Sequence, residues 1–251
     1  MTNSAPAPRA DRPQVAPAAE MPAAAQMHAI LHRRIISGDI LPGTRLSEQE
    51  IADQYDLSRQ PVREAFIRLA SEGLLEVRPQ RGTFVSRIDM DWVLSTRFIR
   101  ESVEADIARL AARRARPEQV ATLRGILERQ EAIAQGDAKA LVTLDEEFHH
   151  TLAEMAGQVM AWNHLQVLKV HLDRVRHLVS AVTPKDVMLD QHRDVVDAVA
   201  SGDEDQAEAA MRLHLRRVFG DLPGIMQLSP QFFDKAEKLS TCMHYDLEVN
   251  V

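Results

Sequence analysis

The sequence predicts a mainly helical protein in two parts, an N-terminal winged helix-turn-helix and a C-terminal, all-helical antiparallel bundle. Two observations lead to this fold class. Residues 47–86 combine two short amphipathic helices, separated by a tight turn, with a predicted hairpin. Residues 89–219 contain one helical pattern after another with short breaks. The low aromatic content of 4% and the ten glycines also favour helices.

Two caps define the predicted helix-turn-helix. Ser47 can accept from the N–H of Glu50, and the Glu50 carboxylate can reach back to the cap, which forms a capping box. Ser58 can cap the second helix. Only Asp56-Leu57 separates the two helices, and such a tight turn is typical of a helix-turn-helix. The apolar face of the second helix consists of Val62, Phe66 and Leu69.

The other face of this second helix carries Arg59, Gln60 and Arg63. An arginine near the start of such a helix can make a bidentate contact to guanine in the major groove. The alternative for this helix alone is an ordinary surface helix with two solvated arginines. Gly73 then ends the helix, and residues 74–86 predict a hairpin with a basic tip. The hairpin completes a winged helix and favours DNA binding.

The net charge of −7 is unevenly distributed. Between Ser58 and Arg87 there are six arginines and three glutamates, a net charge of +3, so the rest of the chain carries −10. A basic surface on an acidic body is sufficient for contact with phosphates.

The single cysteine, Cys242, excludes an internal disulfide framework and fits a reducing cytoplasm. No apolar run reaches the ~18–20 residues that a membrane span needs. The N-terminus also lacks the apolar core of a signal peptide. We therefore expect a cytoplasmic protein with no membrane partner.

The chain is expected to divide into four segments. Residues 1–23, rich in alanine and proline, predict a disordered tail. Residues 24–87 predict the winged helix-turn-helix, and residues 88–220 the helical domain. Residues 221–251 form a tail with a possible short helix near 230–239. The expected helices of the second domain lie near 89–115, 118–135, 138–156, 159–181, 186–200 and 204–219.

Four candidate metal ligands lie on these helices. Asp145 and His149 are four residues apart on the apolar stripe of the helix near 138–156. His192 and His214 lie on apolar stripes of the last two helices, so the four side chains could converge on one cation. Imidazole with carboxylate suits Zn, Ni, Mn or Fe. The alternative for each histidine taken alone is a hydrogen-bonded core residue.

Arg100 and Glu104 are also four residues apart, on the first helix of the bundle. The residues alone indicate a surface salt bridge worth under ~1 kcal/mol.

Residues 27–86 resemble the winged-helix domain of GntR-type bacterial transcription regulators. The resemblance rests on the run from Leu57 to Ala65, on Gly73-Leu74-Leu75 and on residues 81–85. It implies contacts with double-stranded DNA. The candidate DNA-binding residues are Arg45, Ser58, Arg59, Gln60 and Arg63, with Arg81 and Gly82 at the wing.

Residues 88–219 resemble the FCD domain, the helical effector domain of the FadR-like branch of GntR regulators. The matching pieces are residues 100–104, residues 145–149 and the segments around His192 and His214. Many family members bind a divalent metal through this set of ligands. The resemblance therefore implies a divalent metal, Zn, Ni, Mn or Fe, held by Asp145, His149, His192 and His214.

The same resemblance implies an effector site. Arg100 would anchor the carboxylate of a small organic or sugar acid, because its planar fork can hold a carboxylate bidentately. Arg97, one turn away, is the substitute anchor, and Glu104 lies in the same site.

Two functional classes follow. The first is a ligand-responsive transcription regulator, expected to be a repressor, that binds a pseudo-palindromic operator as a homodimer. The second is a metal-dependent hydrolase-type enzyme, in which the three histidines and the aspartate activate water. The sequence contains no recognisable hydrolase motif, and an enzyme would leave the winged helix unexplained. We therefore expect a regulator and no enzymatic activity.

Overall fold

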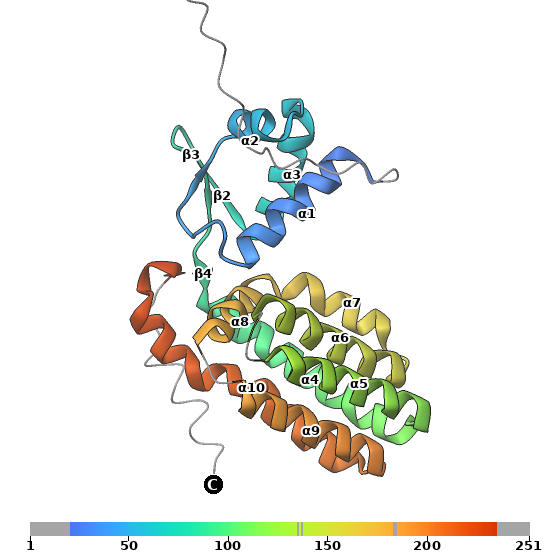
Figure 1. Cartoon of the computed structure of the whole chain (residues 1–251). Helices are drawn as coiled ribbons and strands as arrows, with labels where there is room; N and C mark the ends of the chain where they lie inside the picture. The colour runs from blue at the N-terminus through green and yellow to red at the C-terminus, as the bar shows by residue number, and fades with distance from the viewer. Residues whose placement is uncertain (1–20, 135, 137, 183–184, 235–251) are drawn as a thin grey trace, which may run out of the picture.

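The computed structural model describes residues 21–134, 136, 138–182 and 185–234. A small domain of helices and strands lies above a larger helical bundle, and β4 (Ile88–Asp89) lies where the two meet (Figure 1). The predicted fold class, mainly helical with a winged helix-turn-helix and a bundle, is confirmed. Of the tail predicted for residues 1–23, residues 1–20 lie outside the described residues.

The small domain packs three helices against a three-stranded antiparallel sheet with strand order β1-β3-β2. Its core contains Leu31 and Ile35 from the first helix, Phe66 and Leu69 from the third, and Val85 from the sheet. The elements are α1 (Ala23–Ile36), β1 (Arg45–Leu46), α2 (Glu48–Tyr55), α3 (Arg59–Ser71), β2 (Leu75–Arg78) and β3 (Gly82–Val85).

The two predicted caps are confirmed only in part. Ser47 accepts from the Glu50 N–H at 3.4 Å, but the reciprocal contact is absent among the described residues. Ser58 occupies the N-cap position of α3, yet its hydroxyl makes no capping hydrogen bond within the described chain. Pro61, at the third position of α3, has no N–H, so one of the two donors that a capping serine can use is missing. The exposed Ser58 hydroxyl is therefore available to another partner.

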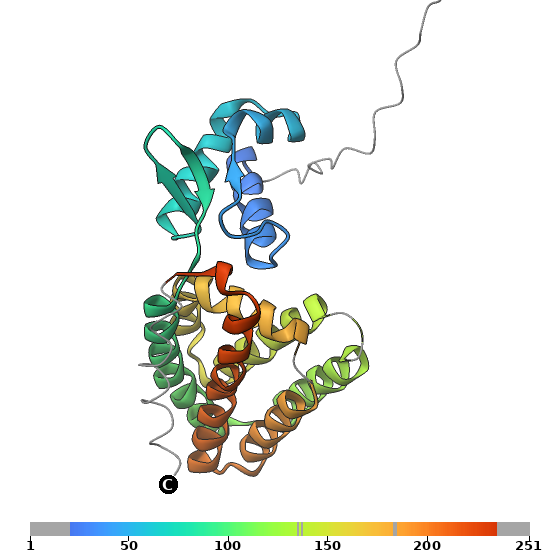
Figure 2. The same cartoon turned by 90° about the vertical axis from the view of Figure 1, so that its left-hand side faces the viewer.

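The large domain is a bundle of long helices, and Figure 2 shows α9 and α10 side by side along its lower part. Its core contains residues such as Ile126, Phe148, Trp162 and Met211. The helices are α4 (Met90–Arg114), α5 (Pro117–Ile133), α6 (Ala138–Ala156), α7 (Val159–Leu168), α8 (Val170–Val182), α9 (Asp186–Ser201) and α10 (Glu204–Leu228).

The single helix predicted near 159–181 is wrong, because the chain breaks at Lys169 into α7 and α8. The Leu168 carbonyl accepts hydrogen bonds from Trp92 Nε1 at 2.8 Å and Thr96 Oγ1 at 3.1 Å, both on α4. The Lys169 side chain is fully buried and pairs with Glu146 of α6. Contacts with other helices therefore accompany the break, which lies at neither a glycine nor a proline.

The end predicted for the last helix, near residue 219, is also wrong. α10 continues through Pro223 to Leu228, and Leu222, Ile225 and Met226 pack into a second apolar cluster of the bundle. The chain then forms a short 3₁₀ turn, η1 (Pro230–Phe232), and the strand β5 (Phe233–Asp234), which pairs in parallel with β4. Of the short helix expected near 230–239, only this turn is observed, and residues 235–239 lie outside the described residues.

α8 joins the two domains. Val170 packs into the core of the small domain. His171 Nδ1 accepts from the Asp89 N–H at 3.3 Å, and Arg174 donates to Ser86, which precedes β4. The first turns of α8 are therefore part of the domain interface.

His171 makes the folded state sensitive to acid. Burial, and secondarily the charge of Arg174, lowers the pKa of His171 from 6.5 to about 4. Since the unfolded chain binds the proton more readily between these values, this contribution to stability is complete above pH 6.5 and is lost as the pH falls toward 4. We expect a loss of about 2 kcal/mol between pH 7 and pH 5.

Denaturant unfolding of the chelated protein and of His171→Asn, in which the amide oxygen replaces Nδ1 as acceptor, measures this loss. The variant is expected to lose less stability than the parent over this interval, whereas His150→Asn, at a half-buried histidine of α6, is expected to follow the parent. Equal losses in the parent and in His171→Asn would show that His171 does not titrate as proposed.

Candidate metal centre and nucleic-acid interface

The predicted DNA-contacting side chains of α3 are exposed around its first two turns. Ser58, Arg59, Gln60 and Arg63 all face solvent. Arg59 forms an ion pair with Glu48 of α2 at 3.2 Å, and Gln60 donates to Glu64 at 2.9 Å. These acidic partners hold the side chains near the start of α3, where a recognition helix contacts base edges.

The wing brings the remaining three candidates together. Arg45 pairs with Phe84 across β1 and β3, which places its side chain over Gly82. A Cβ at Gly82 would lie 2.9 Å from Arg45 Nε, and Gly82 also has a φ of +110°. Any other residue there would displace Arg45 and strain the backbone. Arg81 is exposed at the tip, so the wing presents two arginines.

The four predicted metal ligands, taken from three helices, converge in the bundle. Their candidate ligand atoms all lie within 4.8 Å of one another. His214 Nε2 lies 3.2 Å from His149 Nε2 and 3.3 Å from His192 Nε2. An Asp145 oxygen lies 3.4 Å from His192 Nε2. Tetrahedral Zn–N bonds of ~2.0–2.1 Å place ligand nitrogens roughly 3.3 Å apart, so these separations fit a metal ion.

Two further residues orient the imidazoles. Gln130 on α5 donates its amide N–H to the Leu144 carbonyl, which leaves its oxygen 2.8 Å from His192 Nδ1. A Glu104 oxygen lies 2.5 Å from His149 Nδ1. Each acceptor favours a proton on Nδ1, so the Nε2 lone pair is directed toward the centre of the cluster.

The ionisation of the cluster also suits a cation. Burial lowers the pKa of His149, and lowers those of His192 and His214 further. The imidazoles are therefore neutral near pH 7. Neutral imidazoles whose lone pairs converge beside a carboxylate repel one another, and a divalent cation would remove this repulsion. The residues present therefore fit a metal ion.

Arg176 of α8 is one cation beside this cluster. Its guanidinium pairs with Asp145 and Glu146 of α6 and with Asp173 of α8. Burial, with a smaller effect of the Arg100 charge, lowers the pKa of Arg176 to about 9, so it is protonated at neutral pH.

The candidate effector residues are more enclosed than a surface pair. Arg100 and Glu104 are both buried and form an ion pair, so the surface salt-bridge alternative is wrong. In the part of the chain that the structure describes, Arg100 Nη2 is buried without a hydrogen-bond partner. Glu104 contacts His149 as well as Arg100. Arg97 pairs with Glu101 at 3.2 Å.

Sequence analysis missed Gln130 and Arg176, and it did not connect Glu104 with His149. Gln130 is a glutamine on a buried helix face, which is an unusual position for an amide. Arg176 had a weaker signal, because an arginine on a helix is ordinarily solvated. The partners of both residues lie on other helices, so spacing along the chain could not reveal them.

Comparisons with known proteins agree with this architecture. Residues 23–85 match the family described as bacterial regulatory proteins, gntR family, and residues 96–217 match the FCD domain. The HTH-type transcriptional repressor RspR of Escherichia coli is 38% identical over 212 residues, which cover 84% of this chain and 93% of RspR. An uncharacterised HTH-type regulator of Streptomyces ambofaciens is 40% identical over 205 residues, covering 81% of this chain and 86% of that protein.

Solved structures show the same fold. E. coli McbR/YncC superposes with a TM-score of 0.68 and 22% identity, covering 80% of this chain and 97% of that one. No described helix of this chain has the length and apolar character of a membrane span. With two domain matches and close relatives over most of its length, the chain belongs to the GntR family of DNA-binding transcription regulators and carries an FCD domain.

Proposed function

We propose that this protein is a repressor that binds a pseudo-palindromic operator as a homodimer and responds to a small organic or sugar acid. Residues 24–87 bind DNA in this proposal, and residues 88–220 bind the acid and a divalent metal ion and form the dimer. The name of the relative RspR, a transcriptional repressor, supports the direction of regulation. Two-fold symmetry would place the two recognition helices at half-sites about one DNA turn apart.

The observation that carries the proposal is the convergence of Asp145, His149, His192 and His214 next to a buried arginine. These four residues would hold the divalent ion, which supplies positive charge and open positions for oxygen ligands when bound. Arg100 has a buried Nη2 donor to offer a carboxylate. A small acid suits this combination of charges.

The hydrolase alternative is not retained, because the family to which the chain belongs consists of transcription regulators. The carboxylate nearest the cluster outside the ligand set, Glu104, is engaged with Arg100 and His149. In the proposed site Glu104 therefore orients His149 and does not activate a water molecule.

Arg63→Ala is expected to weaken operator binding by roughly 1–3 kcal/mol, because a bidentate arginine–guanine contact contributes that much discrimination. Fluorescence anisotropy with a duplex selected from random sequence by the purified protein measures the change. Arg68→Ala is the matched control, because Arg68 lies on the same helix, is also exposed and pairs with Glu72. An affinity unchanged by Arg63→Ala would remove α3 from the recognition role.

His149→Ala is expected to lose bound metal and to lower the unfolding temperature of the bundle, because metal binding and packing are coupled at a buried site. Elemental analysis gives the metal content, and thermal unfolding with and without chelator gives the stability. His150→Ala is the control, since the His150 side chain is next in sequence to His149, is 40% exposed and lies outside the cluster. If His149→Ala retains one equivalent of metal, the ion is bound elsewhere.

A further inference from the structure

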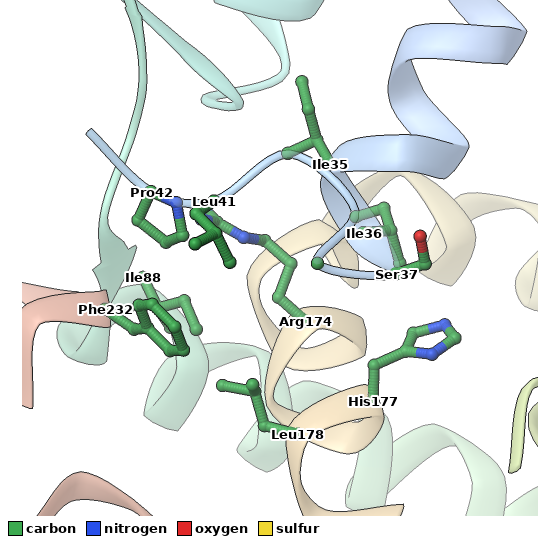
Figure 3. A pocket seen from close by; sticks show the side chains of 11 residues that line it. Ile35, Ile36, Ser37, Leu41, Pro42, Ile88, Arg174, His177, Leu178 and Phe232 are labelled. Atoms are coloured by element: carbon green, nitrogen blue, oxygen red, sulfur yellow. The ribbon is translucent and has the colours of Figure 1, made fainter. Parts of the chain in front are cut away.

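A cavity apart from the histidine cluster lies between the two domains. The interdomain cavity, of about 170 Å³, is partly open to solvent and is lined by the end of α1 and the loop after it, by β4, by α8 and by η1 (Figure 3). Its walls are mostly apolar and come from both domains. The lining side chains that matter here are Ile35, Leu41, Ile88, Arg174, Leu178 and Phe232.

Arg174 is the unusual member of this lining. Its side chain extends from α8 toward the loop of Leu41 and Pro42 (Figure 3). The residue is only 3% exposed. Its guanidinium donates to the Ser86 hydroxyl at 3.3 Å and to the Ser86 carbonyl at 2.8 Å, both neutral acceptors.

No carboxylate of the described residues pairs with Arg174. Arg176, two residues later, has three carboxylate partners. Residues two apart on a helix lie about 200° apart around its axis, so the two arginines face opposite sides of α8. Arg176 faces the histidine cluster, and Arg174 faces the interdomain cavity.

A buried cation without a counter-ion is costly, and proteins ordinarily supply an anion or leave the position to a ligand. Burial lowers the pKa of Arg174 to about 10, so the guanidinium remains charged at neutral pH. The cavity beside it matches in size an engineered apolar cavity of about 150 Å³ that binds benzene. A molecule that binds in this cavity should therefore combine one negative charge with an apolar body about as large as one ring.

We infer that the interdomain cavity binds a small monocarboxylic acid with an apolar body, whose carboxylate pairs with Arg174. The planar guanidinium offers a bidentate geometry that matches a carboxylate. This site is independent of the proposed metal site, because it uses the opposite face of α8. Since its walls come from both domains, an acid bound there stabilises the arrangement of the two domains seen in Figure 1.

Calorimetric titration of the full-length, chelated protein with benzoate tests the inference. Benzoate is expected to bind saturably, and benzyl alcohol, its neutral counterpart, at least tenfold more weakly. Metal-loaded protein is expected to bind benzoate with the same affinity at this site.

Two variants locate the site. Arg174→Gln removes the charge and is expected to weaken benzoate binding at least tenfold, to the level of benzyl alcohol. Leu41→Trp is expected to block the cavity with Arg174 intact, and Leu41 is 50% exposed in a loop, so this change is tolerated by the fold even if Arg174→Gln is not. Arg193→Gln, at an exposed and paired arginine of α9, is the matched control and is expected to bind benzoate normally.

Three results would each overturn the inference. The first is the absence of saturable benzoate binding by the parent protein. The second is equal affinity for benzoate and benzyl alcohol, which would remove the role of the charge. The third is an affinity that survives Leu41→Trp, which would place the acid elsewhere.

Discussion

Arg176 pairs with Asp145 and Glu146 of α6 and with Asp173 of its own helix, so one guanidinium joins α8 to the helix that carries two of the proposed metal ligands. Lys169 reinforces the same joint by pairing with Glu146 and Asp173. Truncating Arg176 would leave the buried Asp145 carboxylate without a cationic partner, which is far more costly than losing an exposed pair. The position of α8 relative to the histidine cluster therefore depends on the balance of these buried charges.

That position matters because α8 also contacts the DNA-binding domain. Val170 lies in the core of that domain, and His171 and Arg174 bind the segment that connects the two domains. A change in charge at the cluster can therefore alter the position of the DNA-binding domain through one helix, α8. Coupling between two sites needs such a shared element, whose position both sites can bias. The benzoate site inferred above uses the same helix from its other face.

The fold class and the helix faces of the four clustered residues could be predicted from local spacing, and the resemblance to the FCD domain supplied their proposed role as metal ligands. Asp145 and His149 share a helix face, and His192 and His214 lie on apolar stripes that had to face the core. The break at Lys169 could not be predicted, because the contacts that accompany it are made with other helices. The Leu168 carbonyl accepts a hydrogen bond from α4, and Lys169 forms an ion pair with Glu146 of α6. Gln130 and Arg176 were missed for the same reason, because their partners lie on other helices.

The central claim is that an acid bound beside the metal controls DNA binding. Fluorescence anisotropy with the selected operator measures this directly, with metal-loaded and chelated protein each titrated with a panel of small organic and sugar acids. The Leu41→Trp background blocks the interdomain cavity and keeps the Arg174–Ser86 contact between the domains intact. At least one acid is expected to lower operator affinity for the metal-loaded protein and to leave the chelated protein unaffected. An acid that acts equally on both forms, or a panel in which none acts on the metal-loaded form, would contradict it.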